Sequence, residues 1–128
     1  MTESRLDELL ARLKVLDPET WSRVDKVLGL VVYPRSPLGH YIIQGVIQEA
    51  IAARGWGFYV STECDNWWDA ESISDMEITF AASILLPDDE MYDFWDGLQL
   101  EWCRADAPAE AILAAYIAAL EAEREAGR

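Results

Sequence analysis

Lysine and arginine are absent from residues 55–103, although this stretch carries twelve Asp and Glu residues and five of the six tryptophans. Residues 1–54 hold seven basic and seven acidic side chains, so the net charge of −14 falls entirely in the rest of the chain. A surface that binds the phosphates of nucleic acid needs a positive field. We therefore expect no direct binding to a nucleic-acid backbone.

Other missing features narrow the class of protein. No apolar run approaches the roughly 18 residues of a membrane span, and the first residues lack the pattern of a secretory signal. The two cysteines, Cys64 and Cys103, are too few for a disulfide framework, and with one histidine they do not suggest a zinc site. At 128 residues and 52% hydrophobic, the chain can bury a core. We expect one cytoplasmic domain, residues 1–128, without membrane contact.

Apolar residues at helical spacing predict four helices. They cover residues 3–15, 18–28, about 39–54 and a segment that begins near 106–108. Asp17 and Pro18 supply an N-cap and a first-turn proline for the second helix, which Gly29 ends. The third is nearly apolar, ends at Gly55, and should be buried on most of its circumference. Residues 1–16 are expected to be peripheral or to mediate oligomerisation.

After Gly55 the apolar period changes to two, which predicts strands. These strands are residues 56–60, 76–84 and 98–103. Their apolar faces place Trp56 and Trp102 in the core, as the second helix places Trp21. The order α-α-α-β-β-β-α predicts an α+β fold with an antiparallel sheet between helical layers. The sheet has three strands, or four if residues 30–33 add one.

Patterns for catalysis and metal binding are scarce. His40, the single histidine, lies at the start of the third helix, where it could act as a catalytic base or simply cap the helix. No nucleophile elbow, phosphate-binding loop or dinucleotide-binding turn is present. The carboxylates of residues 65–71 and 88–96 could gather around a hard cation, but they lack calcium-loop spacing, and a solvated acidic face is the simpler explanation. We predict a non-enzymatic protein with no catalytic residues, no cofactor and no bound metal.

Three tryptophans lie in acidic segments where periodicity does not demand burial. Exposed aromatic side chains surrounded by charge are typical anchors of an interaction, although such residues can also close the end of a core. The predicted acidic-aromatic face consists of Asp65, Trp67, Trp68, Asp69, Asp88, Asp89, Asp93, Trp95 and Asp96. It would occupy a basic surface on a protein partner, because carboxylates present the same sign of field as phosphates.

Short motifs add a resemblance to a known family. In order, the chain carries Val24-Asp-Lys-Val-Leu-Gly29, Pro34 and Pro37, an apolar helix, Gly55-Trp56 opening a strand, and Ala105-Asp-Ala-Pro108 before the last helix. Over residues 20–120 this layout resembles the small phage "ABA sandwich" domain family. The resemblance implies a phage or prophage accessory protein with a sheet between helical layers and no assigned enzymatic chemistry.

Because small phage proteins of this kind are often directed against host immunity, the resemblance gives three hypotheses, all set in the bacterial cytoplasm. In the first, the acidic-aromatic face occupies a basic surface of a host defence protein. In the second, an oligomer sequesters a cyclic or ADP-ribose-derived signalling nucleotide, with aromatic rings stacked on the base and cations on the phosphates. That alternative site consists of Arg23, Lys26, Tyr33, Arg35 and Arg54. In the third, the protein is a phage structural or host-takeover component whose acidity serves only solubility.

Overall fold

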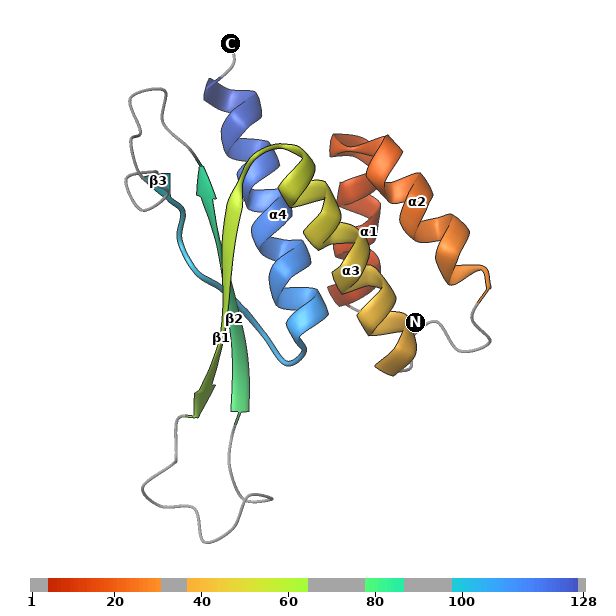
Figure 1. The fold of residues 1–128 in the computed structure, drawn as a ribbon, viewed down its shortest axis with the longest axis horizontal. Coiled ribbons are helices and arrows are strands. Elements are labelled where there is room, and N and C mark those ends of the chain that lie inside the picture. Colours follow the sequence, from red (N-terminus) through yellow and green to blue (C-terminus); the bar gives the residue numbers. More distant parts are fainter. Residues whose placement is uncertain (1–4, 31–36, 65–77, 87–97, 127–128) are drawn as a thin grey trace, which may run out of the picture.

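The computed structural model describes residues 5–30, 37–64, 78–86 and 98–126 (Figure 1). The helices are α1 (Arg5–Leu16), α2 (Pro18–Leu28), α3 (Pro37–Ala53) and α4 (Pro108–Ala126). The strands are β1 (Gly57–Cys64), β2 (Ile78–Leu86), β3 (Leu98–Gln99) and β4 (Cys103–Ala105). Since β3 and β4 both pair antiparallel with β2, they act as one interrupted third strand, and the predicted α-α-α-β-β-β-α order is confirmed.

Local signals in the sequence set the boundaries of α2 and α3. Asp17 caps α2 by accepting a hydrogen bond from the backbone N–H of Thr20 at 3.2 Å, and Pro18 is the first helical residue. Gly29 ends this helix as its C-cap, with right-handed backbone angles. Gly55 has a φ of +75°, which a residue without a Cβ adopts readily, and the chain turns there from α3 into β1.

The inner face of the sheet, which carries Ala82, Ile84 and Ala105, packs against helices. α4 contacts β2 on one side and α1 and α3 on the other (Figure 1). Residues 111–117 of α4 are all buried, because this helix has neighbours on both sides. All four helices lie on the same side of the sheet (Figure 1), and not on both sides as a sandwich implies.

The outer face of the sheet is the one turned away from α4. Residues 81–85 of β2 are buried on both faces, whereas alternation predicts a single buried face. On the outer face, Ser83 is fully buried between the edges of the sheet and donates a hydrogen bond to the carbonyl of Leu100 at 2.7 Å. Tyr59 lies opposite Ser83 in β1, and its ring contacts that of Trp102 with centroids 6.3 Å apart. Small residues in the central strand thus leave room for large side chains from the edges.

The predicted core tryptophans have different environments. Trp56 is 9% exposed and belongs to the core, and Trp21 is partly buried against it. Trp102 is 38% exposed, so its assignment to the core is wrong. It lies in the break between β3 and β4, where the alternation of the strand is lost.

The helices share one apolar core. Leu6, Leu9 and Leu13 of α1 are buried in it together with residues of α3 and α4. α3 is less enclosed than its composition predicts, since Leu38 and Tyr41 near its start are exposed. In the described part of the chain, no helix has both the length and the apolar character needed to cross a bilayer.

Candidate functional site

The nine residues of the predicted acidic-aromatic face lie outside the described residues, as do Tyr33 and Arg35 of the alternative nucleotide site. The structure does fix where the two acidic segments join the sheet. Cys64 pairs with Ile78 at one end of β2, and residues 86 and 98 pair at the other. At about 3.3 Å per residue, the eight steps between the first and last of the nine residues of β2 separate these ends by roughly 26 Å. The segments 65–77 and 87–97 are therefore attached to opposite ends of the sheet.

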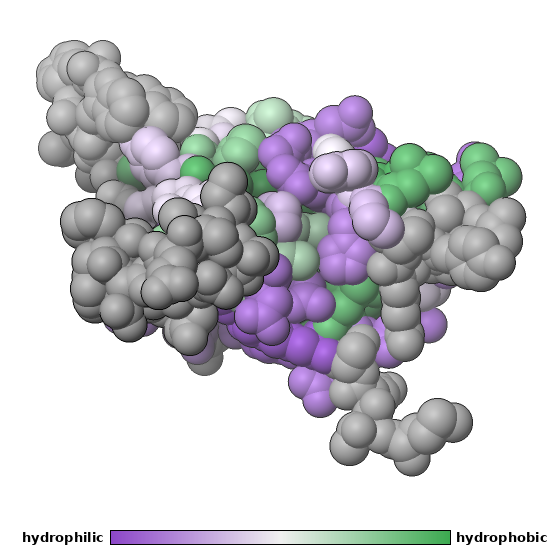
Figure 2. Space-filling model, turned by 90° about the horizontal axis from the view of Figure 1, so that it is seen from below, coloured by the Kyte–Doolittle hydropathy of each residue, from purple (hydrophilic) through white to green (hydrophobic). Residues whose placement is uncertain are grey.

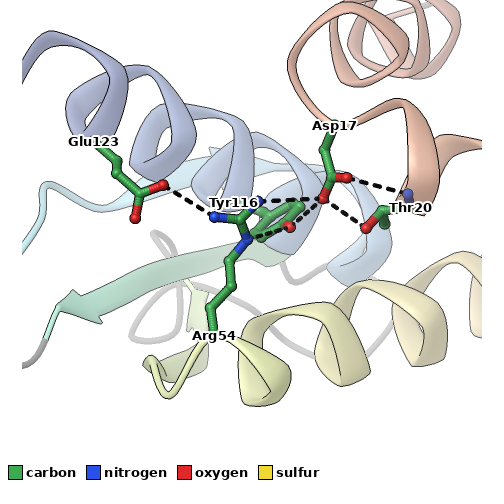
Figure 3. Close-up of polar contacts among 5 residues, drawn as sticks. All are labelled: Asp17, Thr20, Arg54, Tyr116 and Glu123. Atoms are coloured by element: carbon green, nitrogen blue, oxygen red, sulfur yellow. Dashed lines mark hydrogen bonds and ion pairs between the residues drawn. The ribbon is translucent and has the colours of Figure 1, made fainter. Parts of the chain in front are cut away.

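A polar cluster surrounds Arg54, the last cation before the cation-free stretch (Figure 3). Arg54 Nε donates to the Tyr116 hydroxyl at 3.0 Å, one terminal nitrogen pairs with Glu123 at 3.0 Å, and the other lies 3.7 Å from Asp17. The Tyr116 hydroxyl in turn donates to the Asp17 carboxylate at 2.6 Å. The cluster joins the α1–α2 junction, the end of α3 and the middle of α4.

Two aromatic rings also contact the Arg54 guanidinium. It lies 5.1 Å from the ring centroid of Trp56 and 5.9 Å from that of Tyr116, within the range of cation–π attraction. The two rings also contact each other, with centroids 6.0 Å apart and planes tilted by 59°. Arg54 is therefore fixed by aromatic and acidic groups together.

The protonation states in this cluster suit structure more than acid–base chemistry. Burial alone would raise the pKa of Asp17, but hydrogen bonds from Thr20 and Tyr116 and the charge of Arg54 outweigh it and lower that pKa. Burial, and the hydrogen bond to Asp17, raise the pKa of Tyr116. The pKa values of both groups are therefore shifted further from neutral, whereas a general acid or base works best with a pKa near neutral pH.

The alternative nucleotide site can be assessed from its three described residues. Arg23 of α2 forms an ion pair with Glu49 of α3, whereas Arg54 pairs with Asp17 and Glu123. Beside Arg54 lies an open pocket of about 480 Å³, lined by Val15, Leu16, Arg54, Leu120, Glu123 and Arg124. Lys26 lies in the last turn of α2 and is not part of this lining. A phosphate group there would have to compete with carboxylates already bound to Arg54.

A second pocket, of about 490 Å³, contains His40. It is lined by Pro37, His40, Tyr41, Gln44, Phe80, Ala107 and Pro108. On the face of the molecule seen in Figure 2, hydrophobic areas are separated by hydrophilic ones. Among the described residues of this lining, none offers His40 a carboxylate or thiol with which to share a proton, so this part of the site does not favour a catalytic base.

Metal ligands and reactive thiols give no better site. Within residues 5–30, 37–64, 78–86 and 98–126, no three His, Cys, Asp or Glu side chains are grouped as a metal would require. Cys64 and Cys103 are not joined by a disulfide. Burial raises the pKa of Cys103, which disfavours the reactive thiolate.

Comparisons with protein-family models, with curated proteins and with solved structures found no match to this chain. The resemblance to the phage family therefore stays an expectation drawn from sequence motifs. Sequence reasoning assigned Arg54 to phosphate binding and missed its contacts with Asp17 and Tyr116. Asp17 was recognised as an N-cap, but a hydroxyl partner 99 positions away leaves no local signal.

Proposed function

We propose that this protein acts by binding and not by catalysis, with an acidic surface on the side of the sheet that occupies a basic surface of a protein partner. The resemblance to phage accessory proteins supplies the setting, in which the partner is a component of host defence in the bacterial cytoplasm. The proposal concerns residues 55–126, where the acidic surplus lies.

The observation that carries the proposal is the pairing of the arginines. Four of them form ion pairs with carboxylates of other elements: Arg12 with Glu121, Arg23 with Glu49, Arg54 with Asp17 and Glu123, and Arg104 with Glu63. Among the described residues after position 54, two cations, Arg104 and Arg124, face seven carboxylates. Arg104 binds both oxygens of Glu63, at 2.9 and 3.2 Å. Glu63, Glu121 and Glu123 take part in these ion pairs, and the other four carboxylates still outnumber the other cation, Arg124.

This surplus suits recognition of a cationic surface. Segments 65–77 and 87–97 add five carboxylates each and no cation. A concentration of one sign of charge steers an oppositely charged partner and raises its association rate at low salt.

Nucleotide sequestration is the less favoured alternative. It requires cations that can leave their present partners, and both Arg23 and Arg54 have carboxylate partners in the fold. A role in which the acidity serves only solubility predicts no partner that depends on particular acidic residues. A comparison of variants separates the solubility role from the proposal, and the retention of a small molecule in place of a protein separates nucleotide sequestration from it.

The test replaces Asp88, Asp89 and Asp93 together by Asn. A matched control replaces Glu8, Glu19 and Asp25 by Gln, Gln and Asn, which removes the same charge from exposed positions on α1 and α2. A partner is first captured from bacterial lysate at low salt and identified, and its dissociation constant is then measured for each variant. We expect the first variant to bind at least about tenfold more weakly, with a reduced dependence on salt, and the control to bind nearly as the wild type does.

Equal weakening by both sets would show that net charge alone matters and would support the solubility role. A small molecule retained in place of a protein, with a thermal shift on its addition, would favour sequestration of a nucleotide.

A further inference from the structure

β1 forms an edge of the sheet. It pairs with β2 along its full length of eight residues, and no described strand lies on its other side. Val60 in the middle of the strand is 38% exposed. A free strand edge is a row of backbone N–H and C=O groups that can pair with another extended chain.

The register shows which residues direct these groups outward. The backbone carbonyl of Ile84 accepts a hydrogen bond from Leu100 at 2.9 Å, so Ile84 directs its backbone polar groups away from β1. Phe58, which lies opposite Ile84, is therefore in a non-hydrogen-bonded pair. Since such pairs alternate along an antiparallel ladder, Phe58, Val60 and Thr62 direct their N–H and C=O groups to the open edge.

The two edges of the sheet differ in how they are protected. The far edge consists of two short strands, β3 with two residues and β4 with three, separated by a break, and β4 carries Arg104. Short strands, interruptions, prolines and charges are the usual protection of an edge. β1 has an unbroken register, no proline and one charged residue, Glu63. Among the described strands, it is the edge at which an added strand meets the least obstruction.

We infer that β1 accepts an extended, lysine- or arginine-bearing segment of a protein partner as an added antiparallel or parallel strand. The inference rests on the proposed function and specifies how the partner is bound. Charge selects this occupant: residues 55–103 contain no cation and carry twelve carboxylates, of which Glu63 in β1 is already paired with Arg104. A second copy would instead bring together two chains that each carry a net charge of −14.

The added strand would alternate in character. Side chains on the inner side would lie beside Phe58, Val60 and Thr62, where apolar residues fit the partly exposed apolar surface. Side chains on the outer side would lie beside Tyr59, Ser61 and Glu63, where a cation would share the Glu63 carboxylate with Arg104. Backbone pairing would give affinity, and the alternation would give specificity.

The experiment uses the full chain and three labelled peptides as long as β1, all with blocked termini. The first alternates Lys and Val. The second has the same sequence with N-methyl groups on alternate backbone amides, so it keeps the charge but loses the donors on one side of the strand. The third replaces Lys by Gln. Fluorescence anisotropy at low and high salt gives each dissociation constant.

We expect the first peptide to bind, the N-methylated peptide to bind at least about tenfold more weakly, and the Gln peptide to bind weakly at low salt. Equal binding of the first two would overturn the edge pairing while leaving the acidic surface of the proposed function in place. Equal, salt-independent binding of the first and third would overturn the cationic occupant and with it the proposed function.

A pair of variants tests the same edge from the side of the protein. Val60→Pro removes an outward N–H without removing a bond to β2, whereas Val60→Thr keeps the donor. We expect the proline variant alone to lose binding of the Lys-Val peptide, with thermal unfolding used to check that both variants fold. Retained binding by a folded proline variant would overturn the inference. So would concentration-dependent self-association of the wild type that Val60→Pro abolishes, because a second copy would then occupy the edge.

Discussion

The two halves of the chain use charge differently. In residues 5–54, Arg12, Arg23 and Arg54 each pair with a carboxylate on another helix, so charge there links elements of the fold. Among the described residues after position 54, Arg104 and Glu63 form such a link across β2, and Glu121 and Glu123 are the partners of Arg12 and Arg54. The other four carboxylates still outnumber the other cation, Arg124. Exposed ion pairs contribute only about 0–1 kcal/mol each. Stability must therefore come mainly from the apolar core.

Burial separates the helices from the outer parts of the sheet. The largest fully buried side chains include Ile43, Ile47, Ile112 and Ile117 of the helices, and Ile84 of the central strand β2. In the sheet, Val60 and Ile78 are 38% and 41% exposed. The helices are thus expected to provide most of the stability, and the outer parts of the sheet to tolerate change.

The largest expected effect is the loss of a buried helical side chain. Ile117→Ala should lower the free energy of unfolding by about 2–5 kcal/mol, since it removes a fully buried side chain and leaves a cavity. Ile78→Ala makes the same chemical change at an exposed position in β2 and should cost less than about 1.5 kcal/mol. Urea unfolding of both variants measures the difference. Equal losses of unfolding free energy would contradict the difference in burial between the helices and the outer parts of the sheet.

A smaller effect is expected from the cluster that links α4 to the rest of the helical half. Tyr116→Phe removes the hydroxyl that donates to Asp17 and accepts from Arg54, and should cost about 1–3 kcal/mol. Tyr41→Phe is the matched control, because Tyr41 is 68% exposed, and its unfolding free energy should stay within about 0.5 kcal/mol of the wild type. Two indistinguishable denaturation curves would show that the cluster does not hold the helices together.

The smallest effect depends on pH. Asp17 has a lowered pKa in the folded chain, so its charge stabilises the fold above its ordinary pKa of 3.8, and this contribution is lost as the pH falls through the lower folded value. Asp17→Asn keeps a capping side chain but removes the charge, and should cost about 1 kcal/mol near neutral pH. The gap between wild type and variant should close in acid. A gap that stays constant with pH would show that the charge of Asp17 is not involved; Asp25→Asn, exposed on α2, is the control.

Local signals were sufficient for much of the fold. The pair Asp17-Pro18 predicted the start of α2, and Gly55 predicted the turn into β1 that its positive φ provides. The change of apolar period after Gly55 predicted the strands. These features depend on neighbouring residues, which is why they can be recognised from the sequence.

Features that depend on distant residues were not predicted. Burial of both faces of β2 follows from its central position, for which Ala81-Ala82-Ser83 was the available signal. The exposure of Trp102 follows from the break between β3 and β4. For the candidate site, composition identified an acidic surplus, but only the fold shows that Arg23 and Arg54 are paired and that β1 has an open edge. The nine predicted acidic-aromatic residues stay predictions.

Helices α1, α2 and α3 lie on one side of α4 and the sheet lies on the other, so charge is distributed unevenly across the described part of the molecule. The described residues up to position 54 carry equal numbers of cations and carboxylates, whereas those on the other side carry an excess of carboxylates. Such a separation is an electric dipole, and a cationic partner within about one Debye length, roughly 10 Å at 0.1 M salt, exerts a torque on it. This torque would turn the sheet toward the partner before the two molecules touch. A charge added to α1 or α2, far from any contact, should change the rate of association by altering this rotation.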